Sequence, residues 1–146
     1  MVRSATLNDL PALAELFDAY RIFYEKQTDI DGAFHFLQDR MQNKESVIFV
    51  SEAEGHLTGF TQLYPLFSST RMKRLWLLND LFVSPEWRGQ GHSIALIDAA
   101  KELAIQTNAV GLMLETAKSN FIGNQLYPKT GFVCDEDHNY YSWDVT

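Results

Sequence analysis

The chain has a single cysteine among its 146 residues and no long apolar run. One cysteine, Cys134, excludes an internal disulfide and any metal clip built on a Cys-x-x-Cys pair. No segment reaches the roughly 18 consecutive apolar residues of a membrane span. The first residues, MVRSATLND, contain no apolar core of a secretory signal. We therefore expect a cytoplasmic protein.

Basic residues are also scarce: 12 lysines and arginines stand against 19 aspartates and glutamates, so the formal net charge is −7. Proteins that bind nucleic acid usually carry a basic face, whereas here the only basic cluster is Arg71, Lys73 and Arg74, in an expected loop. We expect neither a nucleic-acid nor a membrane partner, and a homodimer stays open. The acidic balance instead suits cationic ligands such as amines. The histidines and the cysteine show no metal-ligand spacing, so we expect no metal.

The chain has the length of one domain, residues 1–146, and its 46% hydrophobic content is enough for one core. Strand-like and helix-like patterns follow one another without a repeat or linker. The expected helices follow Thr6-x-x-Asp9 and span 28–42, 91–106 and 120–129. The expected strands span 46–51, 57–66, 75–83, 111–116, 132–134 and 140–145. This order predicts an α+β or α/β fold with a mixed, mainly antiparallel sheet.

The most informative segment is LNDLFVSPEWRGQGHS, residues 78–93. An apolar strand pattern leads to two glycines, Gly89 and Gly91, and a helical pattern begins directly after them. In this layout the N–H groups and positive dipole of a helix N-terminus hold a phosphate, and glycine lets the ligand approach the backbone. Ile94 stands where a dinucleotide fingerprint needs a third small residue, and no P-loop string occurs. The pattern indicates another cofactor that carries a pyrophosphate.

Three blocks of the sequence together resemble the GNAT acetyltransferase superfamily. Arg-Gly-x-Gly after a strand is similar to its acetyl-CoA motif, (Q/R)-x-x-G-x-(G/A). Residues 113–132, MLETAKSNFIGNQLYPKTGF, resemble the second signature, and VRSATLNDLPALAELF resembles the opening strand and helix. YRIFYEKQTD, GFTQLYPLFSS and LNDLFV resemble the histone and polyamine acetyltransferase branch. The resemblance covers essentially the whole chain and implies the GNAT fold, a mixed sheet splayed in the middle to admit CoA and flanked by about four helices.

The resemblance implies acetyl-CoA as co-substrate and assigns residues to it. The backbone N–H groups of the glycine turn would hold the pyrophosphate, with Arg88 adding charge. The end of the preceding strand would pair its backbone with the pantetheine arm. Asn120 would bond the same arm or cap a helix, and His92, which departs from the family pattern as Ser93 does, also suits a packed imidazole. The implied cofactor residues are Leu81, Phe82, Val83, Arg88, Gly89, Gln90, Gly91, His92, Ser93, Asn120 and Tyr127.

The resemblance also implies a general acid. Tyr127 would protonate the departing CoA thiolate, and a core aromatic is the alternative for this residue. Related polyamine acetyltransferases carry Glu-Asp in the strand that leads to the cofactor, where this chain has Asn79-Asp80. An amide cannot act as a base, so Asp80 and Glu115 are the candidates, although each also suits a structural carboxylate. Strand alternation predicts that Asp80 and Asn79 point to opposite faces of the sheet.

Aromatic and acidic residues lie where this family builds its acceptor pocket, and such residues suit an ammonium group, with ordinary packing as the alternative. The expected acceptor residues are Tyr20, Tyr24, Glu25, Asp29 and Tyr64. We expect an acetyl-CoA-dependent N-acetyltransferase in which a primary amine, of a small polyamine-like molecule or of a protein, attacks the thioester directly. The alternative is a CoA-binding module with a sensing or partner role and little transferase activity.

Overall fold

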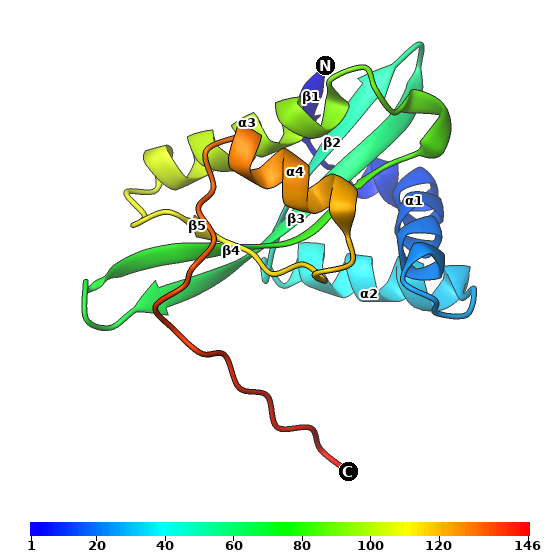
Figure 1. Cartoon of the computed structure of the whole chain (residues 1–146). Helices are drawn as coiled ribbons and strands as arrows, with labels where there is room; N and C mark the ends of the chain where they lie inside the picture. Colours follow the sequence, from blue (N-terminus) through cyan, green and yellow to red (C-terminus); the bar gives the residue numbers. More distant parts are fainter. The chain divides into compact units, whose positions relative to one another are not determined.

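The computed structural model describes residues 1–146, which divide into two compact units, Met1–Glu115 and Thr116–Thr146. The first unit contains a five-stranded sheet in the order β1-β2-β3-β4-β5 (Figure 1). The strands are β1 (Val2–Ser4), β2 (Val47–Ala53), β3 (His56–Ser68), β4 (Lys73–Val83) and β5 (Leu112–Met113). Strands β1 to β4 pair antiparallel and β5 pairs parallel to β4. The predicted mixed, mainly antiparallel sheet is confirmed.

Helices cover both faces of this sheet (Figure 1). They are α1 (Leu10–Phe23), α2 (Ile30–Gln42) and α3 (His92–Gln106), with two short 3₁₀ turns, η1 (Leu7–Asp9) and η2 (Pro85–Trp87). Helices α1 and α2 share one face, where Phe17 and Leu37 join Val50 and Phe60 in a buried cluster. Helix α3 lies against the other face. The sheet is thereby enclosed between two layers of helix, as apolar strand faces require.

At the start of the N-terminal helical segments, aspartate side chains accept hydrogen bonds from backbone N–H groups. The Asp9 carboxylate accepts a hydrogen bond from the Thr6 backbone N–H at 2.7 Å, as the sequence predicted. The predicted start of α2 at Thr28 was wrong by two residues. Asp29 caps this helix instead by accepting from the Gly32 N–H at 2.9 Å, while the Thr28 hydroxyl donates to buried Asp18 at 2.7 Å.

The sheet opens between β4 and β5. These two strands pair over two positions only, Trp76 with Leu112 and Leu77 with Met113. The expected strand at 111–116 is therefore much shorter than predicted, and the rest of β4, residues 78–83, has no partner strand on that side. A strand edge inside a folded unit with unpaired backbone groups can accept an extended ligand as an added strand.

The second unit contains α4 (Phe121–Lys129), which begins after Asn120 as predicted. The predicted strands at 132–134 and 140–145 were wrong, because no regular structure follows α4. Strand propensity describes residues that suit a half-buried, paired surface, whereas Tyr141 and Trp143 are 91% and 85% exposed. The Asp135 carboxylate instead orders a local turn by accepting from the His138 N–H and the Tyr140 hydroxyl.

No helix in either unit has the length and apolar character needed to cross a membrane. The expectation of one domain over 1–146 stays a prediction.

Candidate active site

The glycine turn between β4 and α3 has the backbone conformation that only glycine adopts readily. Gly89 and Gly91 have φ values of 76° and 85°, and Gly91 is the residue that precedes the first turn of α3. A Cβ built on either glycine would meet no atom within 4 Å. The glycines are therefore required by the turn itself, and the space beside them is open to a ligand.

The backbone N–H groups of 89–93 donate no hydrogen bond within the protein. The first helical hydrogen bond after the turn runs from the Ala95 N–H to the Gly91 carbonyl at 3.1 Å. Helix N-termini leave such donors unsatisfied, and together with the helix dipole they attract anions. Five consecutive unpaired donors in open space fit a diphosphate, so the residues present match the group that the sequence implied.

Arg88 is held beside this turn by the end of β4. Its Nε donates to the Val83 carbonyl at 2.9 Å, and its guanidinium lies 5.5 Å from the ring centre of Phe82 and 5.9 Å from that of Phe23. No acidic side chain approaches it within 4.0 Å. Its charge is therefore uncompensated, which suits the predicted contribution at an anionic ligand.

His92 connects the start of α3 to the sheet. Its Nδ1 lies 3.3 Å from the Thr58 hydroxyl, which in turn bonds the Ser51 hydroxyl at 2.7 Å. Its ring stands edge-on to Trp87 with centroids 6.1 Å apart. The packed-imidazole alternative is confirmed for this side chain. The predicted cofactor contact of His92 involves its backbone N–H, which this packing leaves open.

A β-bulge in β4 places Asp80, a candidate base, and the neighbouring Asn79 on the same side of the sheet. Gln62 pairs with Asp80 and Leu63 pairs with Leu78, so Asn79 is an extra residue on β4. The Asn79 Nδ2 donates to the Asp80 Oδ1 at 3.1 Å. The prediction that these two side chains point to opposite faces was wrong, because it assumed unbroken alternation through the bulge.

Asp80 is a buried carboxylate, 4% exposed, with neutral partners only. It accepts from Gln62 Nε2 at 2.8 Å, from Asn79 and from the Tyr20 hydroxyl. Ser46 donates to the Gln62 Oε1 at 2.8 Å and thereby orients the amide so that its NH₂ faces Asp80. Burial raises the pKa of Asp80, and the three hydrogen bonds only partly oppose this effect. No cationic side chain lies within 4.0 Å of it.

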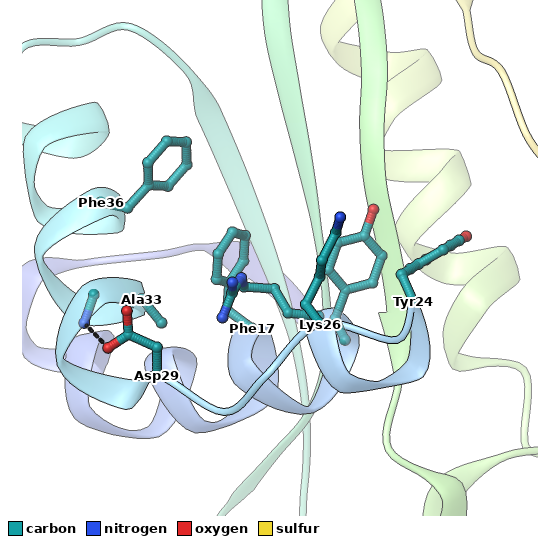
Figure 2. A pocket seen from close by; sticks show the side chains of 9 residues that line it. Phe17, Tyr24, Lys26, Asp29, Ala33 and Phe36 are labelled. Atoms are coloured by element: carbon teal, nitrogen blue, oxygen red, sulfur yellow. Dashed lines mark hydrogen bonds between the residues drawn. The ribbon is translucent and has the colours of Figure 1, made fainter. Parts of the chain in front are cut away.

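A pocket of about 470 Å³ lies between α1 and α2 and contains three of the five predicted acceptor residues (Figure 2). Its lining residues are Phe17, Tyr20, Arg21, Tyr24, Lys26, Asp29, Gly32, Ala33 and Phe36. Glu25 does not line the pocket and occupies a left-handed conformation with φ 63°, just past the end of α1. Tyr64 does not line it either. Tyr64 lies half-buried on β3, where burial and, to a smaller extent, the charge of Asp80 raise its pKa to about 12.

Comparison with known proteins agrees with this arrangement. The model of the acetyltransferase (GNAT) family matches residues 11–132. The chain belongs to the GNAT acetyltransferase family. It is 44% identical over 144 residues to YhfO of Bacillus subtilis, an uncharacterized N-acetyltransferase, and the match covers 99% of this chain and 97% of that protein. A probable acetyltransferase of Haemophilus influenzae is 32% identical over 114 residues, covering 77% and 78%.

A crystal structure of a probable acetyltransferase is similar throughout, with a TM-score of 0.95 and 37% identity over 100% of this chain and 98% of the other. The recognition of a GNAT acetyltransferase from the sequence is thereby confirmed, as are the GNAT fold and the assignment as an acyltransferase. The finer resemblance to the histone and polyamine branch stays a prediction.

The catalytic or cofactor-binding roles predicted for Glu115, Asn120 and Tyr127 stay predictions. Glu115 is exposed at the end of the first unit and makes no side-chain hydrogen bond or ion pair. Asn120 caps α4 by accepting from the Gly123 N–H at 3.1 Å, and its amide donates to Thr116 at 2.9 Å. The cap alternative is therefore confirmed for Asn120. Tyr127 is half-buried and packs edge-on against Phe132, with centroids 5.7 Å apart.

The sequence interpretation missed three side chains that shape the site: Gln62, Arg21 and Lys26. Gln62 stands as a lone polar residue in the apolar strand GFTQLYPLF, which is the signal that could have found it. Arg21 and Lys26 lie inside the block YRIFYEKQTD, where only the aromatic and acidic residues received a role.

Proposed function

We propose that the protein transfers the acetyl group of acetyl-CoA to a primary amine in a ternary complex. The observation that carries the proposal is the row of unpaired N–H groups at 89–93, placed before a helix in a member of the GNAT family. In the reaction the amine nitrogen bonds to the acetyl carbon, and the carbon–sulfur bond breaks. The amine gives up a proton to a base, and the CoA thiolate receives one from an acid.

The chain would hold the co-substrate through backbone groups. The N–H groups of 89–93 would bind the pyrophosphate, with Arg88 nearby as an uncompensated charge. The unpaired side of β4 at Leu81, Phe82 and Val83 would pair with the pantetheine arm. A backbone N–H at this strand end would also polarise the thioester carbonyl, because a fixed donor stabilises the oxyanion as it forms.

Asp80 is the best-supported base. A carboxylate with an ordinary pKa is a weak base at neutral pH, and burial raises the pKa of Asp80 toward the working range. Its neutral surroundings leave its negative charge available to an incoming ammonium group. Glu115 is the second candidate, and it is exposed at the end of the first unit.

Tyr127 is proposed as the acid, as the GNAT resemblance implies. A phenol is protonated at neutral pH and can donate to a thiolate. Replacing Tyr127 with Phe removes only the hydroxyl, so acetyl-CoA should still bind while kcat falls about 100-fold. Single-turnover kinetics measure this step, and an unchanged rate in Tyr127→Phe would remove this residue from the mechanism.

Release of the CoA thiol, with acetyl-CoA and a panel of primary amines, tests the function itself. We expect thiol release above the amine-free background for at least one amine, and mass spectrometry should show the acetamide. Binding of acetyl-CoA by calorimetry, without acetylation of any amine in a broad panel, would instead support the CoA-binding module.

A further inference from the structure

The pocket between α1 and α2 contains a positive charge that an acceptor with only an amine would not use. Lys26 is exposed at the pocket and makes no side-chain hydrogen bond or ion pair. Arg21, the other cation, donates to the Gln27 carbonyl at 3.0 Å and lies 3.8 Å from the Asp18 carboxylate, so it is already engaged. Figure 2 shows the Lys26 side chain among the residues that line this pocket. The ammonium of Lys26 is therefore the unpaired cation of the pocket.

The carboxylate in the same pocket does not compensate Lys26. Asp29 forms no ion pair within 4.0 Å, and its Oδ1 accepts from the Gly32 N–H at the start of α2 (Figure 2). A carboxylate in this position is stabilised by the positive end of the helix dipole, which reduces its attraction for a ligand cation.

The negative charge opposite in sign to Lys26 belongs to Asp80, which lies behind the part of the pocket wall that Tyr20 forms. Tyr20 lines the pocket, and its hydroxyl donates to buried Asp80 and lies 3.5 Å from the Asn79 carbonyl. Asp80 has neutral donors and no cation within hydrogen-bond distance. A buried carboxylate without a cation favours a positively charged group at its approach. The pocket therefore has a negative end beyond Tyr20 and a positive end at Lys26.

Aromatic side chains make up much of the pocket wall. Phe17, Tyr20, Tyr24 and Phe36 all line the pocket, and the rings of Tyr20 and Tyr24 stand edge-on at 5.1 Å. A volume of about 470 Å³ is within the range of small-molecule pockets. An apolar spacer between two charged groups of a ligand would pack against these rings.

We propose that the acceptor is a primary amine that also carries a carboxylate, with its amine directed to the Tyr20 and Asp80 end and its carboxylate paired with Lys26. This inference rests on the proposed acetyl transfer and names the substrate class of that site. A diamine of the same length would place a second ammonium beside Lys26, where like charges repel. The site therefore selects against polyamines, which the acidic net charge of the chain alone would have favoured.

Three matched acceptors test the proposal because they differ only at one end: ε-aminocaproate, hexylamine and hexamethylenediamine. A stiffer aromatic series, para-(aminomethyl)benzoate, benzylamine and para-xylylenediamine, repeats the comparison. In the wild type we expect kcat/KM for the amino acid to exceed that for the diamine by about tenfold. Lys26→Gln should reduce this ratio to about one, and Lys26→Glu should reverse it. Arg71→Gln, an equal charge change in the exposed β3–β4 turn, should leave the ratio unchanged.

Two results would overturn the substrate class: a wild-type preference for the diamines in both series, or Lys26 variants that change all three acceptors equally. Calorimetric binding of the same probes separates this failure from failure of the proposed function. If no amine is acetylated, acetyl transfer is contradicted. The charge pattern of the pocket then still predicts that ε-aminocaproate binds wild type more tightly than Lys26→Gln, and equal binding would contradict it.

Discussion

The glycine turn and the acceptor region are built in different ways. The turn at 89–93 presents consecutive backbone N–H groups, and its shape depends on two glycines that are only two positions apart in the sequence. The acceptor region combines the pocket between α1 and α2 with Asp80 of β4, and Tyr20 and Asp80 are separated by 60 positions. A backbone site follows from local sequence, whereas a site made of distant side chains follows only from how the elements pack. The two regions should therefore fail separately when mutated.

Asp80→Asn should give the largest effect and should affect only the acceptor side. If Asp80 is the base, kcat/KM at neutral pH should fall about 100-fold, while the Kd for acetyl-CoA stays unchanged. The loss should diminish toward pH 9, because free amine then becomes abundant. A pH series of kcat/KM for wild type, for Asp80→Asn and for Glu115→Gln, the variant of the second candidate base, measures this effect. Profiles of the two variants that run parallel to the wild type would reject both carboxylates as bases.

Gly91→Asp should weaken the other region by adding a side chain and a negative charge where the pyrophosphate would sit. We expect the Kd for acetyl-CoA to rise at least about tenfold, or about 1.4 kcal/mol. Gly55→Asp is the control, because Gly55 has a similar φ of 76° and open space, but in the β2–β3 turn. Calorimetry that finds the same affinity in a folded Gly91→Asp protein would exclude the turn as the pyrophosphate site.

Gln62→Leu should produce a smaller effect, seen as a shift of the pH profile. The hydrogen bond from Gln62 stabilises the charged form of Asp80 and so lowers its pKa against the effect of burial. Its removal should raise that pKa further and move the acid limb of the kcat/KM profile to higher pH. Ser46→Ala removes only the hydroxyl that orients the Gln62 amide, so it should shift the acid limb of the kcat/KM profile less. Acid limbs that coincide in wild type and Gln62→Leu would show that Asp80 does not control the rate.

His92→Ala should have the smallest effect on binding. Its side chain contacts Thr58 and Trp87, so the change should cost on the order of 1 kcal/mol of folding free energy. The backbone N–H at residue 92 stays in place, and the affinity for acetyl-CoA should change by less than about threefold. Thermal melting and calorimetry together measure the two expectations. A large loss of affinity without a loss of stability would assign the imidazole itself to the ligand.

The same distinction explains what the sequence could predict. Gly89 and Gly91 between a strand and a helix predicted the turn, and three blocks of the sequence together indicated the family, because each of these signals is local. The opposite orientation expected for Asn79 and Asp80 was wrong, since a one-residue bulge depends on pairing with β3. The roles of Gln62 and Lys26 required knowledge of which chain segments pack together. The terminal strands expected at 132–134 and 140–145 relied on residue type alone, without a pairing partner.

The burial of Asp80 has a consequence for the stability of the protein as well as for its chemistry. A raised pKa means that the folded state binds this proton more tightly than the unfolded chain does. The contribution of Asp80 to folding is therefore most favourable in acid, and it declines as pH rises from the unfolded value near 3.8 through the raised folded value. Asp9, whose pKa lies at about 2, and Asp18, whose pKa is also lowered, contribute in the opposite sense. Their stabilisation of the fold is present above 3.8 and is lost as pH falls below that value.

The window of Asp80 therefore lies above 3.8, whereas those of Asp9 and Asp18 lie below it. Wherever Asp80 is ionised, the empty enzyme keeps an anion in its interior at the expense of its own fold. A cationic acceptor that neutralises this anion would recover part of the lost stability, so occupancy of the amine site would be coupled to resistance to unfolding.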